Sequence, residues 1–377
     1  MNIAIDIRSL MNKQRTGVGE YAYELLDAVF KNADDNQYFL FYNSYKDVSD
    51  NIPKWNYENV HYLFTRWPNK LFSLFTWLGF IKLDRLIKQK VDWFFAPNIN
   101  FLSLSRKTKF ILTVHDLSFE ILPECYTWKR RLWHKALRPK KMCRRADIIL
   151  TPSENTRRDV MREWWIEGDK IKVLYPGLSS VIGYPSNSAG RQISDNNEPR
   201  SEEIKRKYGL PDKYILYLGT IEPRKNILGI IEAYKKSLLL NDKYMLVVAG
   251  ASGWKNEEVL ESLEKTTGVK YIGYVKDEDK AMLYKNADLF VFPSLYEGFG
   301  LPVLEALACG TPVITSDRSS LSEVFGDHAT LVNPNNISEI SRAMKVVLNS
   351  KIETPKIDLE KFDWGKVAEK FLDLTNT

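Results

Sequence analysis

The sequence has few of the residues on which metal centres and disulfide frameworks depend. It contains only three cysteines and four histidines, all far apart along the chain. No two cysteines have the C-x-x-C spacing of a zinc or redox motif, so neither a disulfide framework nor a zinc site is indicated. The cysteines are Cys125, Cys143 and Cys309, and the histidines are His61, His115, His134 and His328.

Long apolar runs are lacking as well. No stretch reaches the roughly 20 apolar residues that a membrane-spanning helix needs. The nearest, from Leu71 to Ile81, favours a half-buried helix, and its aromatic residues leave a helix lying on a membrane surface as the alternative. The chain opens on a strand-like run with no export signal before it. We therefore expect a cytoplasmic protein, at the inner face of the plasma membrane if this helix touches lipid.

The chain as a whole has no large excess of one charge, but one of its segments does. The net charge is only +6, which does not by itself predict binding to nucleic acid. The segment from Lys129 to Arg145, however, holds nine basic residues and no acidic ones. It forms either a solvated helix face or a contact for anionic membrane or a phosphate-bearing, lipid-linked acceptor. No nucleic-acid motif accompanies it, so we expect no nucleic acid partner.

The 377 residues do contain enough apolar material for two cores, at 44% hydrophobic and 27% charged. Short apolar runs alternate with amphipathic helical stretches, which is typical of α/β domains with parallel sheets. In the first half, this pattern predicts strands at Asn2–Ile7, Phe39–Tyr42, Trp93–Ala96, Lys109–Val114, Ile148–Thr151 and Lys172–Leu174.

The alternation breaks between Gly177 and Pro211, where polar residues, glycine and proline dominate. It resumes with strands predicted at Tyr214–Leu218, Tyr244–Ala249, Val269–Tyr271, Leu289–Phe292 and Pro312–Thr315. We therefore expect two doubly wound, Rossmann-like domains, residues 1–195 and 196–362, joined by a polar linker. The tail at 363–377 is predicted to form a separate amphipathic helix.

Ligands of such sheets bind beyond the carboxyl ends of the strands, and the most informative residues lie there. Glu297-Gly298-Phe299-Gly300 follows the predicted strand Leu289–Phe292 and opens a helix near Pro302. Backbone N–H groups at a glycine-rich helix start can hold a phosphate. Glu297 and Glu305 flank this place, where two carboxylates suit hydrogen bonds from sugar or ribose hydroxyls.

Arg224 and Lys225 lie in a second such turn, Gly219 to Asn226, directly after another strand. Adjacent cations there suit a diphosphate whose negative charge grows as its sugar leaves. The alternative interpretation is two solvated cations that cap a loop.

Two weaker candidates belong to the first half. Gly17-x-Gly19 follows the first strand and forms either a phosphate-approaching loop or a plain turn; Ala22 in place of a third glycine argues against a dinucleotide fingerprint. His115 follows the strand Lys109–Val114 and is either a structural histidine or a site residue.

Asp277-Glu278-Asp279 resembles a metal-binding D-x-D motif, but we interpret it as the acidic cap of a helix and expect no catalytic metal.

These motifs together resemble glycosyltransferase family 4, the retaining group with the two-domain GT-B fold. The resemblance rests on Glu297-x7-Glu305 within SLYEGFGLPVLEALACGTPVI and extends over most of the chain. Its other parts are Gly17–Tyr21, Ala249–Trp254, Ser319–Val324 and the Phe362-Asp363-Trp364 entry to the last helix. It implies two domains facing a central cleft, with the acceptor on the first, the donor nucleotide on the second, and the helix 363–377 packed back on the first.

The resemblance also implies roles for residues. Glu297 would hold donor sugar hydroxyls, Glu305 the ribose, and the backbone of Phe299, Gly300 and Leu301 the diphosphate and sugar. Many relatives have Arg where this chain has Thr220, whereas Lys225 matches their lysine and Arg224 lies beside it. Gly17 and Gly19 would face the donor diphosphate, and His115 would contact the donor sugar in the reaction centre.

The resulting hypothesis is a retaining hexosyltransferase that needs no metal or other cofactor. It would move a hexose to a saccharide or lipid-linked acceptor in polysaccharide or glycolipid assembly. We expect this hexose to be mannose and its donor to be GDP-mannose. The alternatives are a UDP-sugar-dependent transferase of the same family, a nucleotide-sugar epimerase, and a non-catalytic subunit that binds sugar nucleotides.

Overall fold

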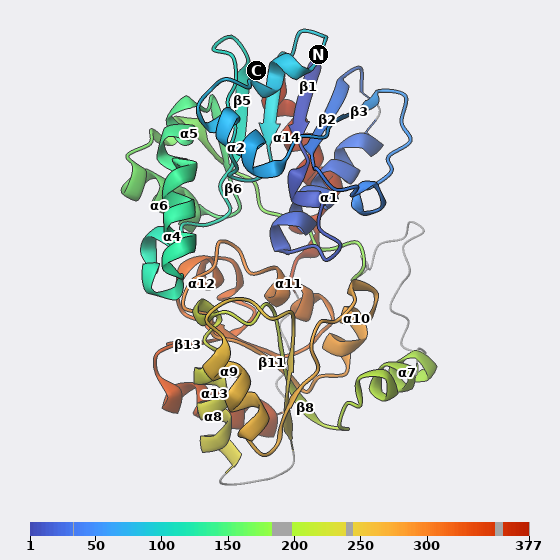
Figure 1. Cartoon of the computed structure of the whole chain (residues 1–377). Coiled ribbons are helices and arrows are strands. Elements are labelled where there is room, and N and C mark those ends of the chain that lie inside the picture. Colours follow the sequence, from blue (N-terminus) through green and yellow to red (C-terminus); the bar gives the residue numbers. More distant parts are fainter. Residues whose placement is uncertain (33, 183–197, 239–243, 351–356, 377) are drawn as a thin grey trace. The chain divides into compact units, whose positions relative to one another are not determined.

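A computed structural model describes residues 1–32, 34–182, 198–238, 244–350 and 357–376. The chain divides into two compact units (Figure 1). The first unit comprises Met1–Leu117, Lys129–Gly177 and Lys361–Thr377, and the second Ser118–Trp128 and Leu178–Glu360. The predicted domain boundary between residues 195 and 196 lies outside the described residues.

The first unit is built on a seven-stranded sheet in the order β3-β2-β1-β4-β5-β6-β7. Every pairing in it is parallel, and the direction of winding reverses between β1 and β4. The strands are β1 (Asn2–Asp6), β2 (Gln37–Asn43), β3 (Val60–Thr65), β4 (Trp93–Ala96), β5 (Lys109–Thr113), β6 (Ile148–Thr151) and β7 (Ile171–Val173).

The helices of this unit include the last one of the chain. In Figure 1 the red C-terminal helix α14 lies beside the blue strands of the first sheet. Its apolar side, including Trp364 and Phe371, belongs to the same buried cluster as β1 and α1, and Trp93 Nε1 donates to the Thr375 carbonyl at 2.9 Å. The helices are α1 (Gly17–Lys31), α2 (Asn69–Trp77), α4 (Trp128–Leu137), α5 (Pro139–Arg145), α6 (Glu154–Trp164) and α14 (Trp364–Thr375).

The second unit has a six-stranded parallel sheet in the order β10-β9-β8-β11-β12-β13. Its strands are β8 (Tyr214–Leu218), β9 (Met245–Ala249), β10 (Val269–Tyr271), β11 (Leu289–Phe292), β12 (Val313–Ser316) and β13 (Thr330–Val332). Its helices are α3 (Ser118–Ile121), α7 (Glu198–Tyr208), α8 (Ile227–Leu238), α9 (Glu257–Lys265), α10 (Asp277–Lys285), α11 (Leu301–Ala308), α12 (Ser319–Phe325) and α13 (Ile337–Asn349).

A short segment, Ser118–Trp128, packs with the second unit although residues on both sides of it belong to the first. Trp254 Nε1 donates to the Cys125 carbonyl at 2.8 Å, and Lys255 Nζ donates to the Glu124 carbonyl at 2.6 Å. The rings of Tyr126 and Trp254 also pack together, at 5.6 Å between centroids. These bonds come from the loop after β9, so they anchor the segment to the edge of the second sheet where the strands end.

The strands predicted from the sequence are present within one or two residues. Two strands were not predicted, β3 and β13, and one prediction was partly wrong. Helix α7 begins at Glu198, inside the stretch from Gly177 to Pro211 where the alternation was expected to break, and Ile204 on it is buried.

Candidate functional site

The second sheet has its topological switch point between β8 and β11. From β8 the chain winds outward to β9 and β10, and from β11 it winds the other way to β12 and β13. The loops after β8 and β11 therefore face each other, which is where ligands bind in sheets of this kind. They are bonded directly, because the Leu295 N–H donates to the Arg224 carbonyl at 2.8 Å and Asn226 Nδ2 donates to the Pro293 carbonyl at 3.2 Å.

A buried ion-pair cluster joins these two loops. Arg224 donates to Glu297 Oε2 at 2.7 Å, and Lys225 Nζ donates to Glu297 Oε1 at 2.5 Å. Both side chains are largely buried, so the interpretation of solvated loop-capping cations is wrong. Each oxygen of Glu297 thus holds one cation, and a carboxylate oxygen still has lone pairs for further donors.

A second carboxylate balances the cluster. The buried Glu222 lies 2.6 Å from Arg224 Nε, so two cations meet two carboxylates. Burial acts to raise the pKa of Glu297, but Arg224 and Lys225 outweigh it and lower that pKa to about 2. Burial and Arg224 lower the pKa of Lys225, and Glu297 counteracts that shift. Glu297 is therefore ionised at neutral pH.

The start of α11 is shaped by Gly300. Its φ of 107° is left-handed, and a Cβ there would lie 2.5 Å from Leu321 Cδ2. A larger residue would have to adopt this left-handed conformation, which L side chains rarely do, and would push the Leu321 side chain of α12 aside. Ser320 of α12 donates to the carbonyls of Glu297 and Phe299, both at 3.0 Å, which fixes the turn. Leu301 is then the first residue of the helix, and the Phe299 ring packs against Phe325.

Glu305 lies on α11, buried, and is held by a residue that the sequence did not identify. The Tyr284 hydroxyl at the end of α10 donates to Glu305 Oε2 at 2.8 Å. Tyr284 is fixed in turn, because the Thr311 hydroxyl donates to its carbonyl at 2.7 Å. Burial and the neighbouring carboxylate raise the pKa of the Tyr284 hydroxyl well above its usual value, so it remains a hydrogen-bond donor.

The acidic run at 277–279 occupies the first turn of α10, as interpreted from the sequence. Asp279 accepts hydrogen bonds from Lys207 Nζ at 2.6 Å and from the Tyr208 hydroxyl at 2.7 Å. It thereby ties α10 to α7. Within the described part of the chain, no cluster of His, Cys, Asp and Glu has the arrangement of a metal site.

In the first unit, the structure corrects the interpretation of Gly17 and Gly19 as a loop. Both lie in the first turn of α1, which begins at Gly17 with Thr16 as its N-cap residue. The helix starts earlier than expected because Glu20 N–H already donates to the Thr16 carbonyl, at 2.8 Å. A Cβ on Gly19 would lie 3.3 Å from the Ser9 carbonyl oxygen, whereas one on Gly17 would meet nothing.

His115 follows β5 and is positioned by two neighbouring elements. Its Nε2 lies 2.7 Å from the Pro97 carbonyl oxygen, and the Tyr21 ring of α1 packs edge-on at 4.9 Å between centroids. Because a carbonyl oxygen only accepts, Nε2 carries the proton and Nδ1 is the acceptor. Burial lowers the pKa of His115, so the ring is neutral at pH 7.

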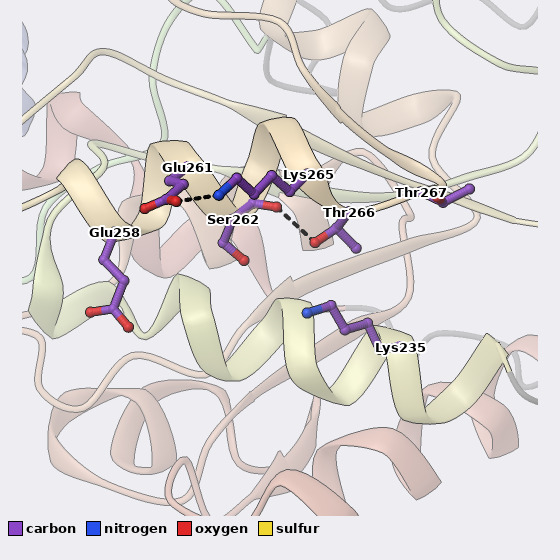
Figure 2. Close-up of a pocket in the computed structure, with 7 residues that line it drawn as sticks. All are labelled: Lys235, Glu258, Glu261, Ser262, Lys265, Thr266 and Thr267. Carbon is purple, nitrogen blue, oxygen red and sulfur yellow. Dashed lines mark hydrogen bonds and ion pairs between the residues drawn. The ribbon is translucent and has the colours of Figure 1, made fainter.

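A surface pocket in the second unit lies apart from these residues. Figure 2 shows it between α8 and α9, with charged and polar side chains around it. None of the predicted site residues lines it. The lining residues are Lys235, Glu258, Glu261, Ser262, Lys265, Thr266 and Thr267.

The structure therefore brings Arg224, Lys225 and Glu297 into direct contact, with Phe299, Gly300 and Leu301 in the turn that follows. Glu305 is on the same helix but bonds to Tyr284. Sequence reasoning missed Glu222 and Tyr284. Glu222 had a usable signal, its position just beyond a strand; Tyr284 had none, because its bond to Glu305 crosses between two helices.

Two family models match the chain, one for each half. Residues 15–180 match the model described as Glycosyltransferase Family 4, and residues 200–360 match the model of glycosyl transferases group 1. The O-antigen chain mannosyltransferase B of Escherichia coli is 36% identical over 248 residues, which cover 64% of this chain and 62% of that protein. The serotype-specific mannosyltransferase WbdA of Escherichia coli is 34% identical over 238 residues, 59% of this chain and 28% of that protein. The chain thus spans less than two thirds of these relatives.

Solved structures resemble the whole chain. The sucrose-phosphate synthase from Thermosynechococcus elongatus matches with a TM-score of 0.71 and 17% identity over 100% of this chain and 98% of that one. WaaG, a glycosyltransferase involved in lipopolysaccharide biosynthesis, matches with a TM-score of 0.63 and 17% identity over 98% and 95%. With the two parallel sheets, this likeness confirms the predicted α/β fold with two Rossmann-like domains.

Proposed function

The chain belongs to the glycosyltransferases that these two models describe, family 4 in its first half and group 1 in its second, and on this premise we propose that it is a hexosyltransferase. It moves a hexose from a nucleotide diphosphate sugar to an acceptor hydroxyl. The observation that carries this proposal is the cluster of Arg224, Lys225 and Glu297 at the switch point of the second sheet.

The two cations suit the leaving diphosphate. As the bond between sugar and phosphate breaks, negative charge grows on the diphosphate, and fixed donors aimed at it stabilise the transition state by about 3–4 kcal/mol each. Glu297 and Glu222 hold Arg224 and Lys225 in place beforehand, so little reorganisation is required. Because Arg224 and Lys225 are hydrogen-bond donors of the chain itself, we propose that transfer needs no metal.

The carboxylates suit the hydroxyl groups of the donor. Glu297 is ionised, and its remaining lone pairs accept hydrogen bonds from hydroxyls of the donor sugar. Glu305 accepts hydrogen bonds from the ribose hydroxyls. The backbone from Phe299 to Leu301 leads into the N-terminus of α11, whose N–H groups suit the diphosphate. His115 is neutral, with Nδ1 as the acceptor. Its proposed role is therefore to accept a hydrogen bond from a sugar hydroxyl rather than to donate a proton.

For the sugar and nucleotide we propose mannose and GDP, in the assembly of a bacterial surface polysaccharide. The relatives named mannosyltransferases support this choice, as do the stretches GTIEPRKN and SLYEGFGLPVLEA of the original resemblance. The resemblance implies retention of the anomeric configuration, which requires either front-face attack or a covalent intermediate, and we propose the front-face route. Isolation of a glycosyl-enzyme adduct would overturn the front-face route.

Turnover of the donor tests the proposal. The purified full chain is incubated with GDP-mannose, or with UDP, dTDP and ADP sugars, in EDTA, and release of nucleotide diphosphate is measured with and without saccharide acceptors. We expect release of GDP from GDP-mannose and its loss in Lys225→Gln, but not in the matched variant Lys235→Gln of α8. Isomerised donor without release would indicate an epimerase, and binding without release a non-catalytic subunit.

A further inference from the structure

Helix α2 of the first unit has an apolar outer side. Leu71, Leu74 and Leu78 recur at helical spacing and are 47%, 47% and 49% exposed. On the inner side of the same helix, Phe72 and Thr76 are buried. The sequence therefore specifies a helix that is apolar on the side packed against the protein and also on the side facing solvent, and monomeric soluble proteins rarely expose such a stripe.

Aromatic residues extend this stripe at both ends of the helix. Phe80 is 76% exposed and Trp67 is 47% exposed. Both rings contact Phe75, at 6.2 Å between centroids in each case. Trp and Phe, together with Leu, form the apolar side of helices that lie at the boundary between lipid headgroups and acyl chains.

Helix α4 lies directly against α2. Trp77 Nε1 of α2 donates to the Ala136 carbonyl of α4 at 2.9 Å, and the Arg138 guanidinium lies 4.2 Å from the Trp77 ring centroid. Leu132 is one turn before Ala136 on α4 and is 59% exposed; its neighbour Trp133 is 45% exposed. Apolar exposure thus continues from one helix onto the other.

Exposed basic side chains accompany these apolar ones on α4 and on α5, the helix that follows it. Arg131, Lys135, Lys141 and Arg144 of α4 and α5 are exposed, and none of them forms an ion pair with a described residue. The segment Lys129–Arg145 contains no acidic residue to neutralise them. Exposed cations beside exposed Leu, Phe and Trp are the combination that anionic bilayers attract.

We propose that this α2–α4 face, consisting of the exposed side chains of residues 67–80 and 131–144 named above, docks on the surface of a bilayer with anionic headgroups. The apolar side chains insert at the level of the headgroups while the cations contact lipid phosphates. A second copy of the chain is a poor occupant, because two such faces would bring positive charge against positive charge. No helix in the described part of the chain has the length and hydropathy to cross a membrane, so the contact is with the surface.

Vesicle binding by the full chain tests this proposal without reference to catalysis. The protein is sedimented with phosphatidylcholine vesicles with and without phosphatidylglycerol, at low and high salt. We expect binding to the anionic vesicles that weakens as salt rises. Each Lys near an anionic surface adds to the free energy of binding, so the double variant Lys135→Gln/Lys141→Gln should weaken binding roughly 30-fold. Leu74→Ser/Leu78→Ser should weaken binding in low and in high salt.

Matched variants distinguish this face from general charge and hydrophobicity. Lys54→Gln/Lys370→Gln removes the same charge from exposed positions elsewhere in the first unit, and Val181→Ser/Val346→Ser removes exposed apolar groups of the second unit. Both should bind like the wild type. Equal loss in the control and test variants, or no binding of the wild type to anionic vesicles, would overturn the proposal. Self-association abolished by Leu74→Ser/Leu78→Ser, without vesicle binding, would instead assign the face to a second copy.

Discussion

At the scale of single residues, the central feature is a carboxylate that holds two cations. Glu297, Arg224 and Lys225 were each predicted from their positions after strands, because ligands of parallel sheets bind there. Their contact with one another was not predictable, since it depends on which strands are neighbours in the sheet. Glu222 and Tyr284 were missed for a related reason: each supports a site residue through the fold rather than through a motif.

The ion pairs of Glu297 should make stability depend on pH in a defined window. Its pKa is about 2 in the folded protein against an ordinary value of 4.5. A depressed carboxyl pKa contributes stability above the unfolded value, and this contribution is lost as the pH falls from about 4.5 toward 2. Glu297→Gln removes the carboxylate that Lys225 contacts and leaves Arg224 with Glu222, which should cost about 3–5 kcal/mol at pH 7.

Urea unfolding of the wild type and Glu297→Gln at a series of pH values measures this effect. The difference between their free energies of unfolding should be largest above pH 5 and shrink as the solution is acidified. Glu261→Gln breaks an exposed pair with Lys265 and should change little at any pH. A difference for Glu297→Gln that does not depend on pH would contradict the assigned ion pairs.

Tyr284 is expected to act on donor binding through Glu305. Tyr284→Phe removes a hydrogen bond to a charged group, which is typically worth about 1.5–3 kcal/mol. If Glu305 holds the ribose, the affinity for the nucleotide should fall roughly tenfold or more, so KM for the donor rises more than kcat falls. Calorimetric titration with the nucleotide and steady-state kinetics measure the two effects.

Tyr234→Phe provides the matched control for this prediction. Tyr234 is also fully buried in the second unit, and its hydroxyl donates to the carbonyls of Tyr244 and Gly268. Its loss should lower stability but leave nucleotide affinity unchanged. Equal nucleotide affinities of Tyr284→Phe and the wild type would show that Tyr284 does not position Glu305 for binding.

At the scale of elements, every central strand was predictable, whereas of the four edge strands β7 and β10 were predicted and β3 and β13 were not. Strands such as β8 and β11 are buried on both sides and read as continuous apolar runs. β3 and β13 lie at sheet edges and are partly exposed, so they carry no such run. The start of α1 was misjudged because two glycines near each other favour a turn, whereas Thr16 and the following residues form a helix start.

The attachment of α14 to the first unit depends on a close approach at Gly177. A Cβ added there would lie 2.6 Å from Trp364 Cγ, which is too near for the indole to keep its place. Gly177→Ala should therefore destabilise the protein by about 1–3 kcal/mol through overpacking. Gly17→Ala, where a Cβ would meet nothing, should be neutral or slightly stabilising because alanine favours helices. Urea unfolding compares the two, and equal stabilities would contradict the packing of Trp364 on Gly177.

At the scale of the whole molecule, the fold and the family were predictable because many motifs occur in one order along the chain. The E-x7-E pattern alone is short, but its position between a strand and a helix, after a basic turn on the neighbouring strand, is far more specific. The exposed face of α2 and α4 was less predictable. An apolar run shows that a helix packs against something, and only the structure distinguishes the buried Phe72 from the exposed Leu71 and Leu74.

The most direct test of the central claim, a nucleotide diphosphate site at Arg224 and Lys225, is the melting temperature of the full chain with GDP, UDP, dTDP or ADP in EDTA. At a roughly hundredfold excess over Kd, a bound nucleotide stabilises the folded state by about 2.7 kcal/mol. The account predicts a selective rise with GDP that is lost in Lys225→Gln and kept in Lys235→Gln. No rise with any nucleotide, or the same rise in Lys225→Gln as in the wild type, would contradict it.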